Sequence, residues 1–160
     1  MLSMLTLFAL ASQPAAGSEV ELGIAQTIAD AADVCVSATI DGGVDLDVLE
    51  TRGWQESNEI LPVRFEHMTF SKESSQARIL VASGYAPFQT CHAIQNIEIE
   101  NEIEVAARQF DEKFGNHIPS EKKFLTYMIK DHAIILAMSK DGDQHVMTSV
   151  VLPKKHLFSR

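Results

Sequence analysis

Two cysteines constrain the fold more than any other sequence feature, because a bond between them would tie two distant segments together. Cys35 and Cys91 are the only cysteines in the chain. An even cysteine count in an exported protein is typical of a disulfide, whereas a closed structural zinc site takes four ligands. We therefore predict a Cys35–Cys91 disulfide. The alternatives are two unpaired buried thiols, or a nucleophilic Cys91 that His92 is poorly placed to activate because adjacent strand residues point to opposite faces.

Residues 1–17 are predicted to be a secretory signal peptide. No charged side chain occurs before Glu19, so the start carries no Lys or Arg. The apolar stretch 2–10 is shorter than the roughly 20 residues that span a bilayer, and small residues follow it, as in signal peptides. Ala9-Leu10-Ala11 is a suitable cleavage site, and a cut near residues 16–17 is the alternative. We expect a periplasmic or secreted protein in which residues 18–160 form a single domain.

A first helix is expected from residue 18 to about residue 38. Ser18 and Glu21 form a capping-box pattern at its start. Apolar residues then recur at spacings of three and four, which places one face of the helix in the core: Val20, Ile24, Ile28, Ala31 and Cys35.

A short second helix is expected around Val48 and Leu49. Asp41-Gly42-Gly43 ends the first helix, Asp45 can cap the second, and Gly53 ends it. Trp54 follows directly, and a large apolar residue in that place often packs back on the last turn. We therefore interpret Trp54 as a core residue rather than a platform for a ligand.

The rest of the chain is dominated by strand patterns. They predict strands at 61–70, 77–83 and 88–97, with the first two forming a hairpin, and at 124–130, 133–139 and 144–152. Asp141-Gly142 predicts a hairpin between the last two strands. Pro153 ends the last strand, and a short basic tail, Lys154-Lys155-His156, follows. The resulting order, ααβββαβββ, predicts an α+β domain with helices on one face of an antiparallel sheet of about six strands.

Residues 97–105 fit two patterns. Isoleucines and a valine alternate with glutamates as in a strand, yet a helical stripe also runs through Ile99, Ile103, Ala106, Ala107, Phe110 and Phe114. Asn101 can cap a helix, and acidic side chains in the first turn favour the helix dipole by about 0.3–1 kcal/mol each. We therefore expect a helix at 101–114 that ends at Gly115-Asn116, with the preceding strand continuing to about Ile99.

The charge balance narrows the class of partner. The formal net charge is −9, which argues against non-specific nucleic-acid binding and against anchoring to anionic lipid. No later segment is apolar for 18 residues, so we expect no stable membrane insertion after signal removal. The densest acidic run is Glu98, Glu100, Glu102 and Glu104. It is either a solvated face or a patch that steers a basic partner.

No motif for chemistry emerges. The six histidines include no i, i+4 pair, although His132 and His145 could lie on adjacent strands. Asp41, Asp45 and Asp47 lack the spacing of a calcium loop, and helix capping explains Asp45. There is no GxSxG motif and no phosphate-binding loop. We assign no catalytic, cofactor-binding or metal-ligating residue and expect no cofactor.

The layout resembles that of small exported proteobacterial proteins whose families are uncharacterised. The shared marks are Cys35 near the end of a first helix, Gly53-Trp54 at the end of a short helix, and Cys91 in a central strand. The resemblance covers roughly residues 24–115. It implies export and a disulfide-stapled α+β domain, and it carries no activity, substrate or catalytic residue.

These observations favour a non-catalytic binding or accessory module, inhibitor-like in action, with a partner protein in the cell envelope. A small envelope enzyme with an unrecognised active site and a structural or stress-related envelope protein are the alternatives. A deep pocket lined by converging His, Asp or Glu would favour the enzyme. A flat or convex sheet face with exposed apolar residues would favour the binding module.

Overall fold

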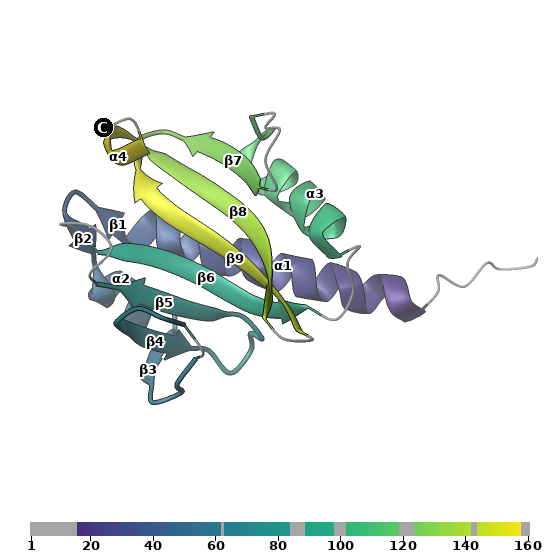
Figure 1. Ribbon diagram of the computed structural model, residues 1–160, viewed down its shortest axis with the longest axis horizontal. Coiled ribbons are helices and arrows are strands. Elements are labelled where there is room, and N and C mark those ends of the chain that lie inside the picture. The colour runs from purple at the N-terminus through teal and green to yellow at the C-terminus, as the bar shows by residue number, and fades with distance from the viewer. Residues whose placement is uncertain are drawn as a thin grey trace, which may run out of the picture.

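The computed structural model describes residues 16–61, 63–83, 89–97, 102–118, 124–141 and 144–157, and it has an α+β fold (Figure 1). The helices are α1 (Ala16–Ala38), α2 (Leu46–Thr51), α3 (Glu102–Phe114) and α4 (Lys154–Leu157). The strands are β1 (Thr39–Ile40), β2 (Gly43–Val44), β3 (Gln55–Ser57), β4 (His67–Ser71), β5 (Arg78–Ala82), β6 (Thr90–Ile97), β7 (Phe124–Ile129), β8 (His132–Asp141) and β9 (Gln144–Pro153).

The main sheet joins two antiparallel meanders. Its seven strands have the order β3-β4-β5-β6-β9-β8-β7, so chain neighbours pair within β3–β6 and within β7–β9. The two meanders meet where β6 pairs antiparallel with β9, from Cys91 opposite Val151 to Ile97 opposite His145. Between β6 and β7 the chain passes through α3 and reaches the far edge of the sheet. β1 and β2 form a separate two-stranded hairpin.

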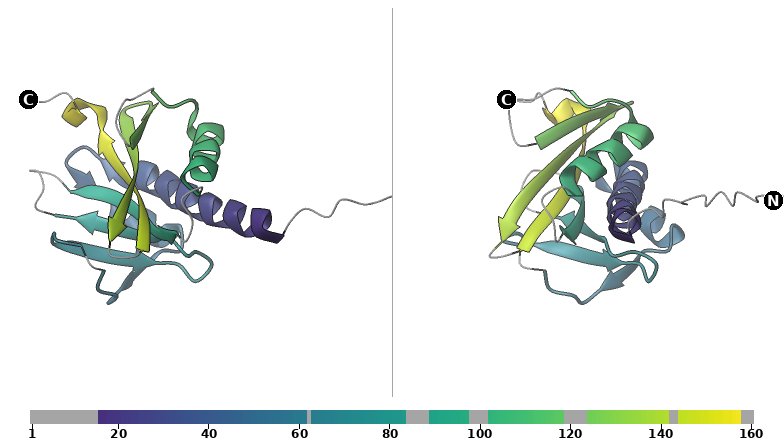
Figure 2. Two further views of the ribbon diagram at one scale, coloured as in Figure 1. Left: turned by 45° about the vertical axis from the view of Figure 1, so that its right-hand side comes forward. Right: turned by 90° about the vertical axis from the view of Figure 1, so that its right-hand side faces the viewer.

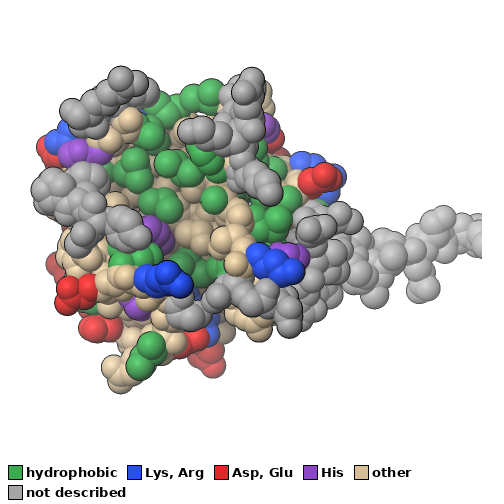
Figure 3. Space-filling view, viewed as in Figure 1, with side chains coloured by type: hydrophobic (Ala, Val, Ile, Leu, Met, Phe, Trp, Pro, Cys, Tyr) green, Lys and Arg blue, Asp and Glu red, His purple; other side chains and the backbone are tan. Residues whose placement is uncertain are grey.

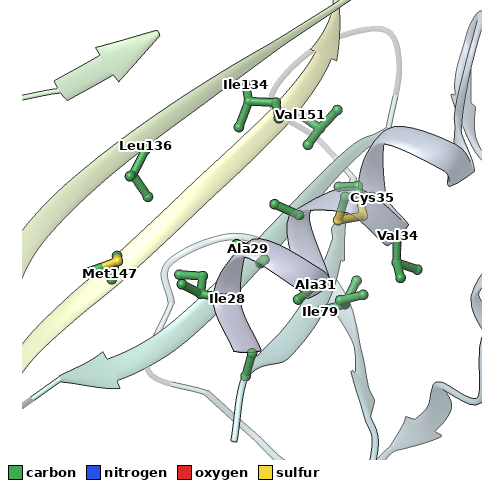
Figure 4. Close-up of a cluster of buried hydrophobic side chains, with 14 of the residues drawn as sticks. Ile28, Ala29, Ala31, Val34, Cys35, Ile79, Ile134, Leu136, Met147 and Val151 are labelled. Carbon is green, nitrogen blue, oxygen red and sulfur yellow. A yellow bond between two sulfur atoms is a disulfide. The ribbon is translucent and has the colours of Figure 1, made fainter. Parts of the chain in front are cut away.

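The core lies between α1 and one face of this sheet. Figure 2 shows α1 and α3 on the same side of the sheet, and an ion pair from Lys113 Nζ to Asp30 Oδ1 (2.7 Å) joins them. The buried side of α1 is rich in alanine, which lets the helix approach the strands closely: Ala25, Ala29, Ala31, Ala32 and Ala38 are all fully buried. Ile28 fills the space towards β9, near Met147 (Figure 4).

The predicted disulfide is present. Cys35 on α1 and Cys91 on β6 are bonded, with their Cα atoms 5.4 Å apart and a sequence separation of 56. Both side chains are fully buried, and Figure 4 shows the bond between the helix and the strand below it. The alternatives of unpaired thiols and of a nucleophilic Cys91 are therefore wrong.

The predicted start of α2 at Asp45 and its predicted end at Gly53 are confirmed. The carboxylate of Asp45, the N-cap residue, accepts a hydrogen bond from the Asp47 backbone N–H (3.1 Å). Gly53 has φ +82°, a left-handed conformation that glycine adopts without strain. This turn brings the Trp54 N–H to the Leu49 carbonyl (3.0 Å). Trp54 is 3% exposed, which confirms it as a core residue.

The expected element order was incomplete. β1, β2 and β3 were not predicted, and neither was α4, which occupies the place of the expected basic tail. Ser18 is not the N-cap of the first helix, because α1 already begins at Ala16. Of the residues expected to form a signal peptide, 1–15 lie outside the described residues, so that expectation stays a prediction.

The strand expected at 61–70 is shorter, since β4 spans only His67–Ser71. The Val63 N–H donates to the Leu61 carbonyl (2.8 Å), which closes a tight turn where an extended strand was expected. The expected strands 77–83 and 88–97 correspond to β5 and β6, and the β4–β5 hairpin is confirmed. Of the ambiguous segment, α3 confirms the helix, while residues 98–101 lie outside the described residues.

Candidate functional site

The main sheet has one face covered by helices and one outer face. Side chains alternate between faces along each strand, and the paired residues of neighbouring strands share a face. Cys91, Leu136 and Met147 therefore face α1, as their place in the core shows. The outer face carries the residues between them, such as His92, Ile135 and Val150.

The outer face is partly covered at β4–β6. Phe65, in the segment before β4, lies with its ring centroid 5.5 Å from that of His92 and 5.8 Å from that of His67. From the same segment, the Glu59 carbonyl accepts a hydrogen bond from Thr69 Oγ1 (3.1 Å). These contacts close the outer face over the first meander, and they bury most of His92.

Burial controls the protonation of His92. Desolvation lowers the pKa of its imidazole to about 4. His92 Nε2 lies 2.8 Å from Thr90 Oγ1, which provides a hydrogen-bond partner for the neutral ring. His92 is therefore neutral at physiological pH and forms part of the packing of the sheet.

The outer face over β7–β9 is apolar. Its outward-pointing residues at 124–128, 133–139 and 146–152 include no charged side chain. We call six partly exposed apolar side chains on this face, five from these strands and one from β6, the outer patch: Ile94, Met128, Ile135, Val146, Val150 and Leu152. Figure 3 shows hydrophobic side chains gathered over these strands. Polar uncharged residues, Thr126, Ser139 and Thr148, lie among them. Apolar side chains gathered at the surface in this way are typical of interaction sites on soluble proteins.

A pocket lies between α3 and the edge strand β7. It has a volume of about 480 Å³, and its described lining consists of Ile103, Glu104, Ala107, His117, Phe124, Leu125 and Met138. This volume is within the range of small-molecule sites, roughly 300–1,000 Å³. All but two of these side chains are apolar.

The polar group of this pocket is an imidazole held by a carboxylate. His117 Nδ1 lies 3.0 Å from Asp111 Oδ1. Gly115, with φ +85°, ends α3 and turns the chain so that His117 returns beside the last turn of the helix. Sequence spacing alone did not reveal this pair, although a helix-ending glycine between a carboxylate and a histidine is a signal for it.

Tyr127 forms the buried floor beside this pair. Its ring packs on Phe110 at 5.5 Å and on His117 at 5.9 Å between centroids. Its hydroxyl donates to the Ala107 carbonyl (3.3 Å). Burial, followed by the nearby Asp111 carboxylate, raises the pKa of this phenol, so Tyr127 stays neutral.

A second hollow, of about 490 Å³, lies between the β1–β2 hairpin, the β7–β8 turn and α4. Its polar groups are engaged with each other. Asp41 forms an ion pair with Lys155, whose hydrogen bond lowers the pKa of that carboxyl. His132 Nε2 donates to the Thr39 carbonyl (2.9 Å). These contacts join α4 and β8 to the β1–β2 hairpin, which directly follows α1.

The histidines and aspartates weighed in the sequence as metal ligands lie apart or have other partners. His132 pairs with Pro153 and His145 with Lys140, so these histidines lie at opposite ends of the β8–β9 ladder. Asp41 pairs with Lys155 and Asp45 caps α2, so the aspartates serve separate roles. Throughout the described ranges, no three His, Cys, Asp or Glu side chains come together as metal ligands.

The acidic run is described only in part. Glu98 and Glu100 lie outside the described residues, whereas Glu104 is exposed on α3 at the pocket.

Among the helices that the structure describes, none is long and apolar enough to cross a membrane.

The buried polar side chains of the core include Gln95 on β6 and Ser149 on β9. Gln95 Oε1 accepts a hydrogen bond from Thr27 Oγ1 (2.7 Å), and Gln95 is 2% exposed. Ser149 on β9 is fully buried, and its hydroxyl has no hydrogen-bond partner in the described part of the chain. Neither group opens into a pocket described above.

No protein-family profile, curated protein or solved structure matches this chain. The outer patch and the α3–β7 pocket are therefore the features on which a functional argument rests. The resemblance to small exported proteobacterial proteins stays a prediction.

Proposed function

We propose that this protein is an exported, non-catalytic binding module that holds a partner protein of the cell envelope against the outer patch. The observation that carries the proposal is the lack of charge on this face. The chain has a net charge of −9, yet the outward side chains over β7–β9 are uncharged, and most of them are partly exposed. An apolar patch on a protein whose remaining surface is charged is typical of a protein-interaction site.

Charge complementarity favours a basic partner over a second copy of this chain. Two copies would each carry a net charge of −9, and this repulsion opposes their approach. A partner with an apolar surface surrounded by Lys and Arg would be attracted at long range and would bury the outer patch on contact. We therefore commit to a basic envelope protein as the occupant.

Export is supported by two independent features. The apolar stretch at 2–10 is typical of a signal peptide. The buried Cys35–Cys91 bond is typical of an oxidising compartment, since cytosolic thiols are kept reduced. Both features support a periplasmic or secreted protein and agree with the proposed resemblance to small exported proteobacterial proteins.

The test places a photo-crosslinking residue at Ile135 in the full chain within its native cell envelope. Ile135 lies in the middle of β8, directly opposite Val150 on β9. We expect a crosslink to a discrete basic protein, and its loss when Val150→Glu is added. The matched control position is Glu112, which is exposed on α3 and should give no such product.

Each variant is first checked by its thermal unfolding midpoint, so that a lost crosslink reports binding rather than misfolding. The purified pair should then bind more weakly as salt concentration rises. Crosslinks only between copies of this chain, identical products at Ile135 and Glu112, or no product at Ile135 would each contradict the proposal.

A small envelope enzyme is the second candidate, and the Asp111–His117 pair favours it. A carboxylate that orients an imidazole beside an apolar pocket is an arrangement used for general-base catalysis. If this candidate is right, the purified protein should hydrolyse aryl esters, and His117→Gln should abolish that activity while leaving the fold intact. Equal rates in the parent chain and His117→Gln would exclude His117 as the base.

A further inference from the structure

The α3–β7 pocket carries an inference that is independent of the outer patch. Its apolar wall comes from three elements: Ile103 and Ala107 on α3, Phe124 and Leu125 on β7, and Met138 on β8. The only polar side chains in its described lining are those of Glu104 and His117. A ligand would therefore be mostly apolar, with one polar end near these two residues.

The hydrogen-bonding groups of His117 and Glu104 determine which head group the pocket can bind. A carboxylate only accepts hydrogen bonds, so the contact of 3.0 Å between Asp111 and His117 places the proton on His117 Nδ1. In the neutral ring, Nε2 is then an acceptor, and no described residue bonds to it. Glu104, exposed at the pocket, is also an acceptor.

Glu104 thus requires a donor from the ligand, and the neutral His117 ring requires one as well. Asp111 adds a further negative charge behind His117, so the site disfavours an anionic head group and favours a cationic one. Tyr127 offers the ligand no donor, because its hydroxyl donates to the Ala107 carbonyl and lies beside the Asp111 carboxylate.

We propose that the pocket binds a small amphiphile with an apolar body and a primary ammonium head. The alkyl body lies against Ile103, Phe124 and Met138. The ammonium group donates hydrogen bonds to His117 Nε2 and to the Glu104 carboxylate.

The test uses three probes of equal chain length with different head groups: octylamine, octanol and octanoate. Binding to the full chain is measured by isothermal titration calorimetry and by the thermal unfolding midpoint. We expect saturable one-to-one binding of octylamine, weaker binding of octanol, and at least about tenfold weaker binding of octanoate, since charge-assisted hydrogen bonds are lost and repulsion is added.

Variants separate the pocket from other apolar surface. Ala107→Trp fills the pocket and should abolish octylamine binding. Glu104→Gln removes an exposed charge without threatening the fold and should weaken octylamine binding about tenfold, with octanol little changed. Glu112→Gln, on the same helix but outside the pocket lining, is the matched control and should bind normally.

The outer patch is the competing location for an alkyl chain. Val150→Glu should leave octylamine binding unchanged, even though the same substitution abolishes the crosslink expected at Ile135. The inference is overturned if octanoate binds as well as octylamine, if Ala107→Trp binds normally, or if Val150→Glu abolishes octylamine binding.

Discussion

Acid should destabilise this protein through one histidine, His92. The ring lies on β6 beneath Phe65, and burial lowers its pKa to about 4 in the folded state. An exposed histidine in the unfolded chain titrates near 6.5. Because the folded-state pKa is the lower one, the unfolded chain binds the proton first as pH falls. The stability is complete above about pH 6.5 and is lost progressively towards pH 4.

The size of the effect follows from these two pKa values. Each pH unit between them costs about 1.4 kcal/mol of unfolding free energy. Between pH 7.5 and pH 4.5, the linkage relation gives a loss of roughly 2.5 kcal/mol. This is a large fraction of the stability of a typical domain, which is about 5–15 kcal/mol.

Urea unfolding at both pH values measures this loss. Trp54 is the only tryptophan and is 3% exposed, so its fluorescence reports unfolding directly. The decisive variant is His92→Leu, which keeps an apolar group of similar size under Phe65. Whatever its stability at pH 7.5, its difference between pH 7.5 and pH 4.5 should be smaller than that of the parent chain by roughly 2.5 kcal/mol.

A histidine on the neighbouring strand provides the control. His145→Gln on β9 should keep the pH dependence of the parent chain. If His92→Leu instead loses as much stability on acidification as the parent, His92 does not carry the effect and the argument from its burial fails.

Three further substitutions test other parts of the fold by the same urea assay. Replacing both Cys35 and Cys91 by Ala should cost about 4 kcal/mol, because the bond closes a 56-residue loop; a loss below about 1 kcal/mol would refute this account. Ser149→Ala should raise stability by about 1 kcal/mol, since it removes a buried hydroxyl without a partner, and a loss of stability would reveal a bond to that hydroxyl. Asp45→Ala should cost about 1 kcal/mol by removing the α2 cap, whereas Asp47→Ala retains the capping contact and should cost less.

The sequence predicts helices and strands well where neighbouring residues alone determine their positions. The end of α1 at Ala38, the cap at Asp45, and the strands β5 to β9 all follow from capping residues, glycines and side-chain periodicity. The disulfide also follows, because an even cysteine count in a chain that is predicted to be exported leaves few alternatives. The short strands β1, β2 and β3 have two or three residues each, too few for an alternating pattern to emerge.

Other features depend on distant contacts and could not be predicted in this way. Val63 and Phe65 alternate with polar residues as in a strand, yet Phe65 packs over the outer face because His92 and His67 provide a surface for its ring. The chain has 22 carboxylates, and local patterns do not show which one orients a histidine. Asp111 and His117 are brought together by the turn at Gly115 and by packing on Tyr127.

The joining of the two meanders at β6 and β9 has a consequence for biogenesis. β6 is synthesised long before its partner, so until residue 151 is available one edge of β6 has no strand to pair with. An unpaired edge is a template for pairing with other chains. C-terminal truncations that remove β9 should therefore accumulate as aggregates rather than as smaller folded domains, and a growing chain needs protection at β6 until its last strand arrives.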